Sequence, residues 1–160
     1  MKLKIYVESS VISYLTARSS RDIVILAHQQ ITQVWWEEKS KDFELYISPL
    51  VDREISRGDP TAAAKRKEIL VNLNYLKETD DIGNIALDLI SKGSLPTKAL
   101  EDALHIAIAA YYEMDFLLTW NCAHIANAAT RKLIDKILTN NRLVPPTICT
   151  PEELLGRSSV

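Results

Sequence analysis

The sequence predicts an α/β protein in which helices cover both faces of a central parallel sheet of about five strands. Short runs of β-branched, aromatic and other apolar residues alternate with longer stretches of helical periodicity along the chain. Such alternation typically gives right-handed crossovers between parallel strands, so that the sheet is buried on both faces. With 160 residues, of which 47% are hydrophobic, the chain is long enough to build one three-layer core of this kind.

The elements follow one another with turn residues between several of them, such as Gly58-Asp59-Pro60 and Pro145-Pro146. The expected strands are Leu3–Val7, Glu44–Ser48, Tyr75–Glu78, Asp115–Thr119 and Thr147–Cys149. The expected helices are Val11–Ala17, Ile23–Ser40, Leu50–Arg57, Thr61–Asn72, Ile82–Ser91, Lys98–Met114 and Ala123–Thr139. We therefore expect one domain over residues 1–150 and a C-terminal tail over residues 151–160, with residues 157–160 fraying.

Composition excludes several classes of protein. The net charge of −2 and the pI near 5.9 argue against binding nucleic acid by bulk charge, but they leave room for a nuclease with a local basic patch or a metal. No stretch approaches the roughly 20 apolar residues of a membrane span, and the first strand is too short for a signal-peptide core. Cys122 and Cys149 have no metal-ligand spacing. We expect a cytoplasmic protein that does not contact a membrane.

Two carboxylates stand beside apolar segments. Glu8 closes the first strand, and Asp102 lies near the start of the apolar helix Lys98–Met114. An unpaired buried carboxylate costs several kcal/mol, so such positions suggest a bound cation or a reaction. An alternative remains open for Asp102: with Thr97 as N-cap, Glu101 and Asp102 would only stabilise the positive end of the helix dipole.

The topology predicts that these acids converge with two further polar residues. Ligands of an open parallel sheet bind outside the carboxyl ends of its strands. Glu8 and Asn121 both follow strand ends, and Glu54 lies in the helix after the second strand. Two successive helices precede the fourth strand, so the helix that carries Asp102 can begin at the same edge. Oxygen ligands of this type suit Mg²⁺ or Mn²⁺ better than zinc.

The three histidines give a weaker signal, because His28, His105 and His124 have no ligand spacing. His105 follows Asp102 by three residues and could form a hydrogen bond near the site. An ordinary packed or surface histidine is the favoured interpretation.

Four segments, taken in order, resemble PIN-domain proteins, and especially the VapC-like toxins of bacterial toxin–antitoxin pairs. The segments are Ile5–Leu15, Ile47–Ile55, Glu101–Ala109 and Asp115–Asn121. The resemblance covers most of the chain, up to about Cys149. It implies a three-layer α/β/α PIN-like (Rossmann-like) fold and Mg²⁺- or Mn²⁺-dependent endonuclease action on RNA. It also implies an antitoxin partner and a homodimer.

By position, the resemblance assigns the four acidic places of the family to Glu8, Glu54, Asp102 and Asn121. Glu8 and Asp102 would bind the metal, Glu54 would orient or deprotonate a metal-bound water, and Asn121 would position substrate or a metal water. The first and fourth places usually hold aspartate. Glu8 is one methylene longer and Asn121 carries no charge, so a second metal is expected to bind weakly.

Candidate substrate contacts lie next to these residues. Ser9 and Ser10 can donate hydrogen bonds to a carboxylate or a phosphate, or can simply cap the helix that follows. Arg53 and Lys98 can hold the RNA backbone, with solvated surface charge as the alternative for each. Arg18, Arg21 and Arg57 can hold the RNA backbone in the same way, with the same alternative.

Three functions remain open. The sequence favours a metal-dependent endoribonuclease that acts as a toxin. A degenerate PIN domain that binds RNA or a protein without cleaving is the second interpretation, because Asn121 lacks a charge. A Rossmann-like phosphohydrolase is the third, and it is weakened because the first strand has no Asp-x-Asp or glycine-rich turn.

Overall fold

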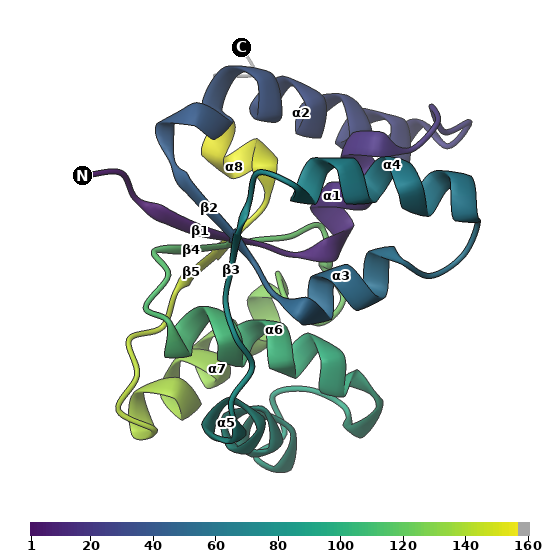
Figure 1. Ribbon diagram of the computed structural model, residues 1–160. Coiled ribbons are helices and arrows are strands. Elements are labelled where there is room, and N and C mark those ends of the chain that lie inside the picture. Colours follow the sequence, from purple (N-terminus) through teal and green to yellow (C-terminus); the bar gives the residue numbers. More distant parts are fainter. Residues whose placement is uncertain (157–160) are drawn as a thin grey trace.

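A computed structural model describes residues 1–156 and contains one five-stranded sheet with the strand order β3-β2-β1-β4-β5 (Figure 1). The strands are β1 (Lys4–Val7), β2 (Glu44–Ile47), β3 (Asn74–Tyr75), β4 (Phe116–Leu118) and β5 (Thr147–Cys149). Every strand pairing is parallel. The central strand β1 therefore lies between β2 and β4, and the predicted parallel sheet of five strands is confirmed.

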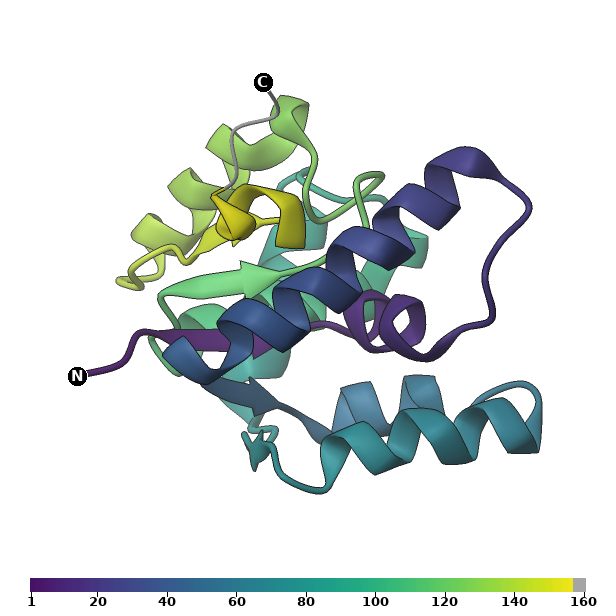
Figure 2. The same cartoon turned by 90° about the horizontal axis from the view of Figure 1, so that it is seen from above.

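Helices cover the two faces of the sheet in two groups (Figure 1). One group contains α1 (Ser9–Thr16), α2 (Ile23–Lys39), α3 (Pro49–Ile55), α4 (Pro60–Leu70) and α8 (Pro151–Leu155). The other contains α5 (Asp80–Ser91), α6 (Leu100–Tyr111) and α7 (Ala128–Asn140). Short 3-10 turns, η1 (Ser40–Asp42) and η2 (Thr97–Ala99), precede β2 and α6. Viewed from above, α2 runs across the strands on its face (Figure 2). The three-layer α/β/α architecture is confirmed.

Burial explains why β1 and α6 occupy the centre. Ile5, Tyr6 and Val7 of β1 are fully buried, as expected for a strand covered on both faces. Along α6 the buried residues form an almost continuous series, Ala103 and then His105 to Ala110. A helix that is apolar nearly all round belongs inside the protein, as the sequence predicts. The packing fixes the position of the first turn of α6, where Asp102 lies.

The helix expected over Lys98–Met114 begins differently. Residues Thr97–Ala99 form the turn η2, and α6 starts at Leu100. Its N-cap is Ala99, which makes no side-chain hydrogen bond, so the prediction of Thr97 as the cap is wrong. Asp102 still lies in the first turn, as expected.

The helix expected over Ala123–Thr139 starts five residues later, at Ala128, and is capped by Asn127. The preceding residues form a turn because the backbone carbonyl of Asn121 accepts hydrogen bonds from the amides of Ile125 and Ala126, at 3.1 and 2.8 Å. The chain therefore folds back on itself just after β4.

Residues 151–155 of the expected C-terminal tail form the helix α8 instead. Thr150 and Glu153 make a reciprocal capping box, and Pro151 and Leu155 are buried. The helix packs on α2, so the folded part of the chain extends past residue 150. Residues 157–160, which were expected to fray, lie outside the described residues. No helix within residues 1–156 is long and apolar enough to span a membrane.

Candidate functional site

The carboxylate of Glu8 is held at the carboxyl end of β1. The backbone amide of Glu8 donates to the carbonyl of Leu118 in β4, at 3.0 Å, and this places Glu8 beside Thr119. Its Oε2 accepts hydrogen bonds from the Ser10 amide at 3.1 Å, from the Ser10 hydroxyl, and from the Thr119 hydroxyl at 2.7 Å. Glu8 is only 5% exposed. It is itself the N-cap of α1, so Ser9 and Ser10 are the first residues of the helix and not its cap.

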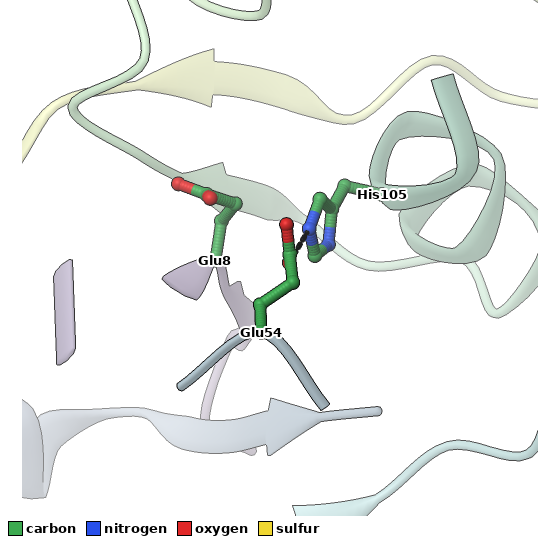
Figure 3. Close-up of side chains that lie close together, drawn as sticks. All are labelled: Glu8, Glu54 and His105. Carbon is green, nitrogen blue, oxygen red and sulfur yellow. Dashed lines mark hydrogen bonds and ion pairs between the residues drawn. The ribbon is translucent and has the colours of Figure 1, made fainter. Parts of the chain in front are cut away.

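The carboxylate of Glu54 is held from two other elements. Glu54 lies near the end of α3, and its Oε1 accepts from the Ser9 hydroxyl at 2.6 Å and from His105 Nε2 of α6 at 2.5 Å. One ligand atom from each of Glu8, Glu54 and His105 lies within 4.8 Å of the others. The close-up shows the Glu54 carboxylate against the imidazole of His105, whereas the Glu8 carboxylate points to the other side (Figure 3). We call these three residues the glutamate group.

Glu54 and His105 stabilise the charged form of each other. Burial alone would raise the pKa of Glu54, but the hydrogen bond and charge of His105, the Ser9 hydroxyl and the charge of Arg57 outweigh it and lower that pKa. Burial alone would lower the pKa of the fully buried His105, but its hydrogen bond to Glu54 and the charges of Glu8, Glu54 and Asp102 raise it. The pair therefore favours a carboxylate beside an imidazolium.

Asp102 belongs to a second set of side chains, which we call the aspartate group. Its Oδ1 accepts from the amide nitrogen of Asn121 at 3.1 Å, and its Oδ2 lies 2.7 Å from His124 Nδ1. The Asn121 side-chain oxygen accepts from the backbone amide of His124 at 3.1 Å. The aspartate side chain is 20% exposed and the His124 side chain 32%. The side chains of Asp102 and His124 are therefore more exposed to solvent than those of the glutamate group.

The structure thus brings together the four residues in two pairs. Glu8 and Glu54 lie in the glutamate group, and Asp102 and Asn121 lie in the aspartate group. The charge of Asp102 acts on His105, so the two groups are in electrostatic contact. His124 was not predicted as a site residue, because only the turn after β4 brings it back to Asp102. The turn residues Asn121 and Asn127 were the available signal.

The hydroxyls and cations near the site have definite partners. Ser9 and Ser10 both donate to carboxylates, as described above. Arg53 pairs with Glu78 at 2.9 Å and is half exposed. Arg57, just after α3, makes two hydrogen bonds to Glu101 in the first turn of α6, at 3.1 and 2.7 Å.

Lys98 is an exposed residue of η2, two residues before α6. It forms no ion pair within residues 1–156. Within these residues Arg53 is paired and Lys98 is not, so Lys98 is the better placed of these two predicted cations to bind an anionic ligand.

The arrangement of acceptors fits a hard divalent cation. All hydrogen bonds to Glu8 fall on Oε2 and all those to Glu54 fall on Oε1, so Oε1 of Glu8 and Oε2 of Glu54 have no donor among residues 1–156. Each oxygen of Asp102 receives one donor and retains further acceptor capacity. Carboxylate and carbonyl oxygens of this kind suit Mg²⁺ or Mn²⁺.

Comparisons with known proteins show the fold. No family model matches the sequence, and no curated protein matches it. Among solved structures, the chain is similar to the VapC20 toxin of Mycobacterium tuberculosis, described as cleaving the sarcin–ricin loop, with a TM-score of 0.61 and 16% identity. That match covers 78% of this chain and 95% of the other.

The chain is also similar to VapBC2 of Rickettsia felis, solved bound to a DNA fragment from its promoter, with a TM-score of 0.57 and 14% identity. Here 92% of this chain and 98% of the other are covered. The chain therefore has the PIN-like three-layer fold of the VapC toxins, as the sequence predicts.

Proposed function

We propose that this protein is a Mg²⁺- or Mn²⁺-dependent endoribonuclease, and the toxin of a toxin–antitoxin pair. One observation carries the proposal: at the carboxyl edge of a sheet with the fold of VapC toxins, Glu8 and Glu54 each have one oxygen fixed by donors and one with no donor among residues 1–156. Such prepared carboxylates are what a cation site requires, and ligands of parallel sheets bind at this edge.

In this proposal each residue has a definite task. When bound, the metal would supply Lewis-acid activation of a water and neutralise charge on the phosphodiester. Glu8 and Asp102 hold the metal directly or through water. Glu54, whose pKa is lowered, is ionised at neutral pH and orients the attacking water or takes its proton. Asn121 and His124 fix the rotamer of Asp102.

The substrate contacts follow from the partners already described. Lys98 contacts an RNA phosphate, because its charge has no ion-pair partner among the described residues. Arg53 can do so after releasing Glu78. Ser9 and Ser10 act mainly by donating hydrogen bonds to Glu54 and Glu8. Their effect on the substrate is indirect, because it passes through the position of these carboxylates.

We further propose a cognate antitoxin, a homodimer and a cytoplasmic location. The antitoxin is suggested by the similarity to the VapBC2 assembly. An antitoxin gene next to the coding sequence would support this part of the proposal. Co-purification of its product with this chain would test it directly.

A non-cleaving PIN domain that binds RNA or protein is the second candidate. It is favoured by one observation, that both carboxylate oxygens of Asp102 already have a hydrogen-bond partner, Asn121 for Oδ1 and His124 for Oδ2. In that case the hydrogen bonds of the aspartate group would only hold the structure together, and the group would bind no cation.

The test is RNA cleavage by the purified protein with Mn²⁺, with Mg²⁺ and with EDTA. Cleavage that requires the metal and is lost in Glu54→Gln supports the proposal. The matched control is Glu68→Gln, which removes an exposed acid of α4. RNA binding without cleavage in any metal would favour the second candidate.

A further inference from the structure

A buried row of polar side chains leads from the sheet to Glu54. The hydroxyl of Tyr6 in β1 lies 2.8 Å from Ser48 Oγ and 2.8 Å from His105 Nδ1. His105 Nε2 then lies 2.5 Å from Glu54 Oε1. Tyr6, Ser48 and His105 are all fully buried. Buried polar atoms are costly unless they are paired, and each hydroxyl and ring nitrogen of this row has a partner.

The hydrogen-bonding capacities fix how the row is connected. A carboxylate only accepts, so His105 Nε2–H donates to Glu54. When the imidazole is neutral, Nδ1 accepts from the hydroxyl of Tyr6, which accepts from the hydroxyl of Ser48. When the ring is charged, Nδ1–H donates to the hydroxyl of Tyr6, which in turn donates to Ser48 Oγ. In both states the ring cannot rotate without losing two hydrogen bonds.

His105 belongs to the group of side chains that can hold a metal ion, but both of its ring nitrogens are in use. A metal could bind Nε2 only by displacing Glu54 from it. The bonds of His105 and Ser9 fall on the same oxygen of Glu54, Oε1, and this leaves Oε2 for a ligand. The geometry therefore favours His105 as a residue that orients Glu54.

We propose that Ser48, Tyr6 and His105 form a positioning relay that fixes which oxygen of Glu54 faces the metal. The hydrogen bonds of the relay do not depend on what the protein does, whereas its effect on metal binding rests on the proposed function. In the proposed function Glu54 acts on the metal-bound water, and partners that orient such groups at a metal site typically contribute about 10- to 100-fold to metal affinity or activity. The relay acts through Glu54 and touches neither metal nor RNA.

The first test is Tyr6→Phe, which removes only the hydroxyl that joins Ser48 to His105. Mn²⁺ binding, followed by electron paramagnetic resonance of the free ion, should weaken about 10-fold. The matched control is Ser94→Ala, which removes a buried hydroxyl bonded to the Leu89 carbonyl at 2.6 Å. It should lower the melting temperature without weakening Mn²⁺ binding. Mn²⁺ binding by Tyr6→Phe equal to that of the wild type would overturn the relay.

The second test separates a positioning residue from a ligand. His105→Gln keeps an N–H donor that can reach Glu54 but removes the imidazole, whereas His105→Leu removes both. If His105 positions Glu54, the glutamine variant binds Mn²⁺ at least about 5-fold more tightly than the leucine variant. Equal losses in the two variants would show that the imidazole itself is a ligand, and this would contradict the proposal.

The third measurement needs no metal. In ¹⁵N spectra of the imidazole nitrogens, Tyr6→Phe should shift the Nδ1 resonance of His105, because that atom loses its partner. An unchanged resonance would rule the relay out. A wild-type chain that binds no Mn²⁺ and cuts no RNA would overturn the proposed function, and the His105 resonance would still decide whether the relay exists.

Discussion

The glutamate group and the aspartate group lie at the same edge of the sheet but are built differently. In the first, each carboxylate uses one oxygen for all its donors, and the other has no donor in the part of the chain that the structure describes. In the second, Asp102 gives one oxygen to Asn121 and the other to His124. The first is set in elements packed against the core. The second joins the first turn of α6 to the turn after β4.

This difference suggests that the two groups have different roles in binding a cation. A buried carboxylate with one fixed and one free oxygen is prepared for a cation, because little reorganisation remains when the ion binds. A carboxylate whose two oxygens both have hydrogen-bond partners is already satisfied without a cation, and it must share those oxygens with a metal. The glutamate group should therefore determine whether a cation binds, and the aspartate group should adjust how tightly.

The largest effect is expected in the glutamate group. Glu54→Gln should lower the rate of RNA cleavage by at least about 100-fold, since a residue that orients or deprotonates the water typically contributes about 10²- to 10⁴-fold. Glu8→Gln should weaken Mn²⁺ binding at the same time. Cleavage rates measured at saturating Mn²⁺ check the first expectation. A rate within 3-fold of the wild type in Glu54→Gln would remove Glu54 from the site.

A smaller effect is expected in the aspartate group. His124→Ala removes the partner of Asp102 Oδ2, and it should raise the Mn²⁺ concentration for half-maximal cleavage by about 10-fold. The maximal rate should change less than this concentration does. If the maximal rate fell and the metal dependence did not move, His124 would take part in the chemistry itself.

Asn121→Asp tests the aspartate group by adding a charge to it instead of removing a side chain. It replaces a donor to Asp102 with a second negative charge, which should cost about 1–3 kcal/mol of unfolding free energy without metal. At this chain length that lowers the melting temperature by about 2–4 °C per kcal/mol. Added Mn²⁺ should then stabilise the variant more than the wild type, because the added charge favours the cation and a ligand that binds more tightly stabilises the folded state more. A variant that Mn²⁺ does not stabilise would place the cation away from the aspartate group.

The smallest expected effect is on the pH dependence of stability. The pKa of His105 is raised above 6.5, so its contribution is complete below that pH and is lost as the pH rises through the raised value. The pKa of Glu54 is lowered below 4.5, so its contribution is present above that pH and is lost as the pH falls through the lowered value. In metal-free buffer, the melting temperature should therefore fall by a few degrees above pH 6.5.

His105→Gln is the control for that pH series, because glutamine does not titrate. Its melting temperature should stay level over the same range above pH 6.5. A parallel fall in wild type and variant would show that other groups cause the pH dependence.

The sequence predicts the fold because each layer has its own local signal. The β-branched strands, the nearly all-apolar helix that became α6 and the turns between them all agree on one architecture. The boundaries were less predictable. Strand β3 is confined to Asn74–Tyr75, both exposed at the sheet edge, where burial gives no periodic pattern.

The candidate site could be predicted only where topology dictates it. Glu8 and Asn121 follow from the rule that ligands bind at the carboxyl ends of parallel strands. Glu54 and Asp102 follow from the helices that lie at the same edge. Tyr6 and His124 could not be predicted, because neither has a signature of its own. The first looks like a core aromatic residue, and the second is brought to Asp102 by a turn that depends on hydrogen bonds to Asn121.

The most direct test of the account is a Mn²⁺ titration of RNA cleavage by the wild type beside Asp102→Ala and the double variant Glu8→Gln/Glu54→Gln. The account predicts cleavage that saturates with Mn²⁺ in the wild type and a curve displaced to higher Mn²⁺ in Asp102→Ala. It predicts no measurable cleavage in the double variant. Cleavage by Asp102→Ala with an unchanged curve, or by any of the three proteins in EDTA, would contradict a metal-dependent site at this edge of the sheet.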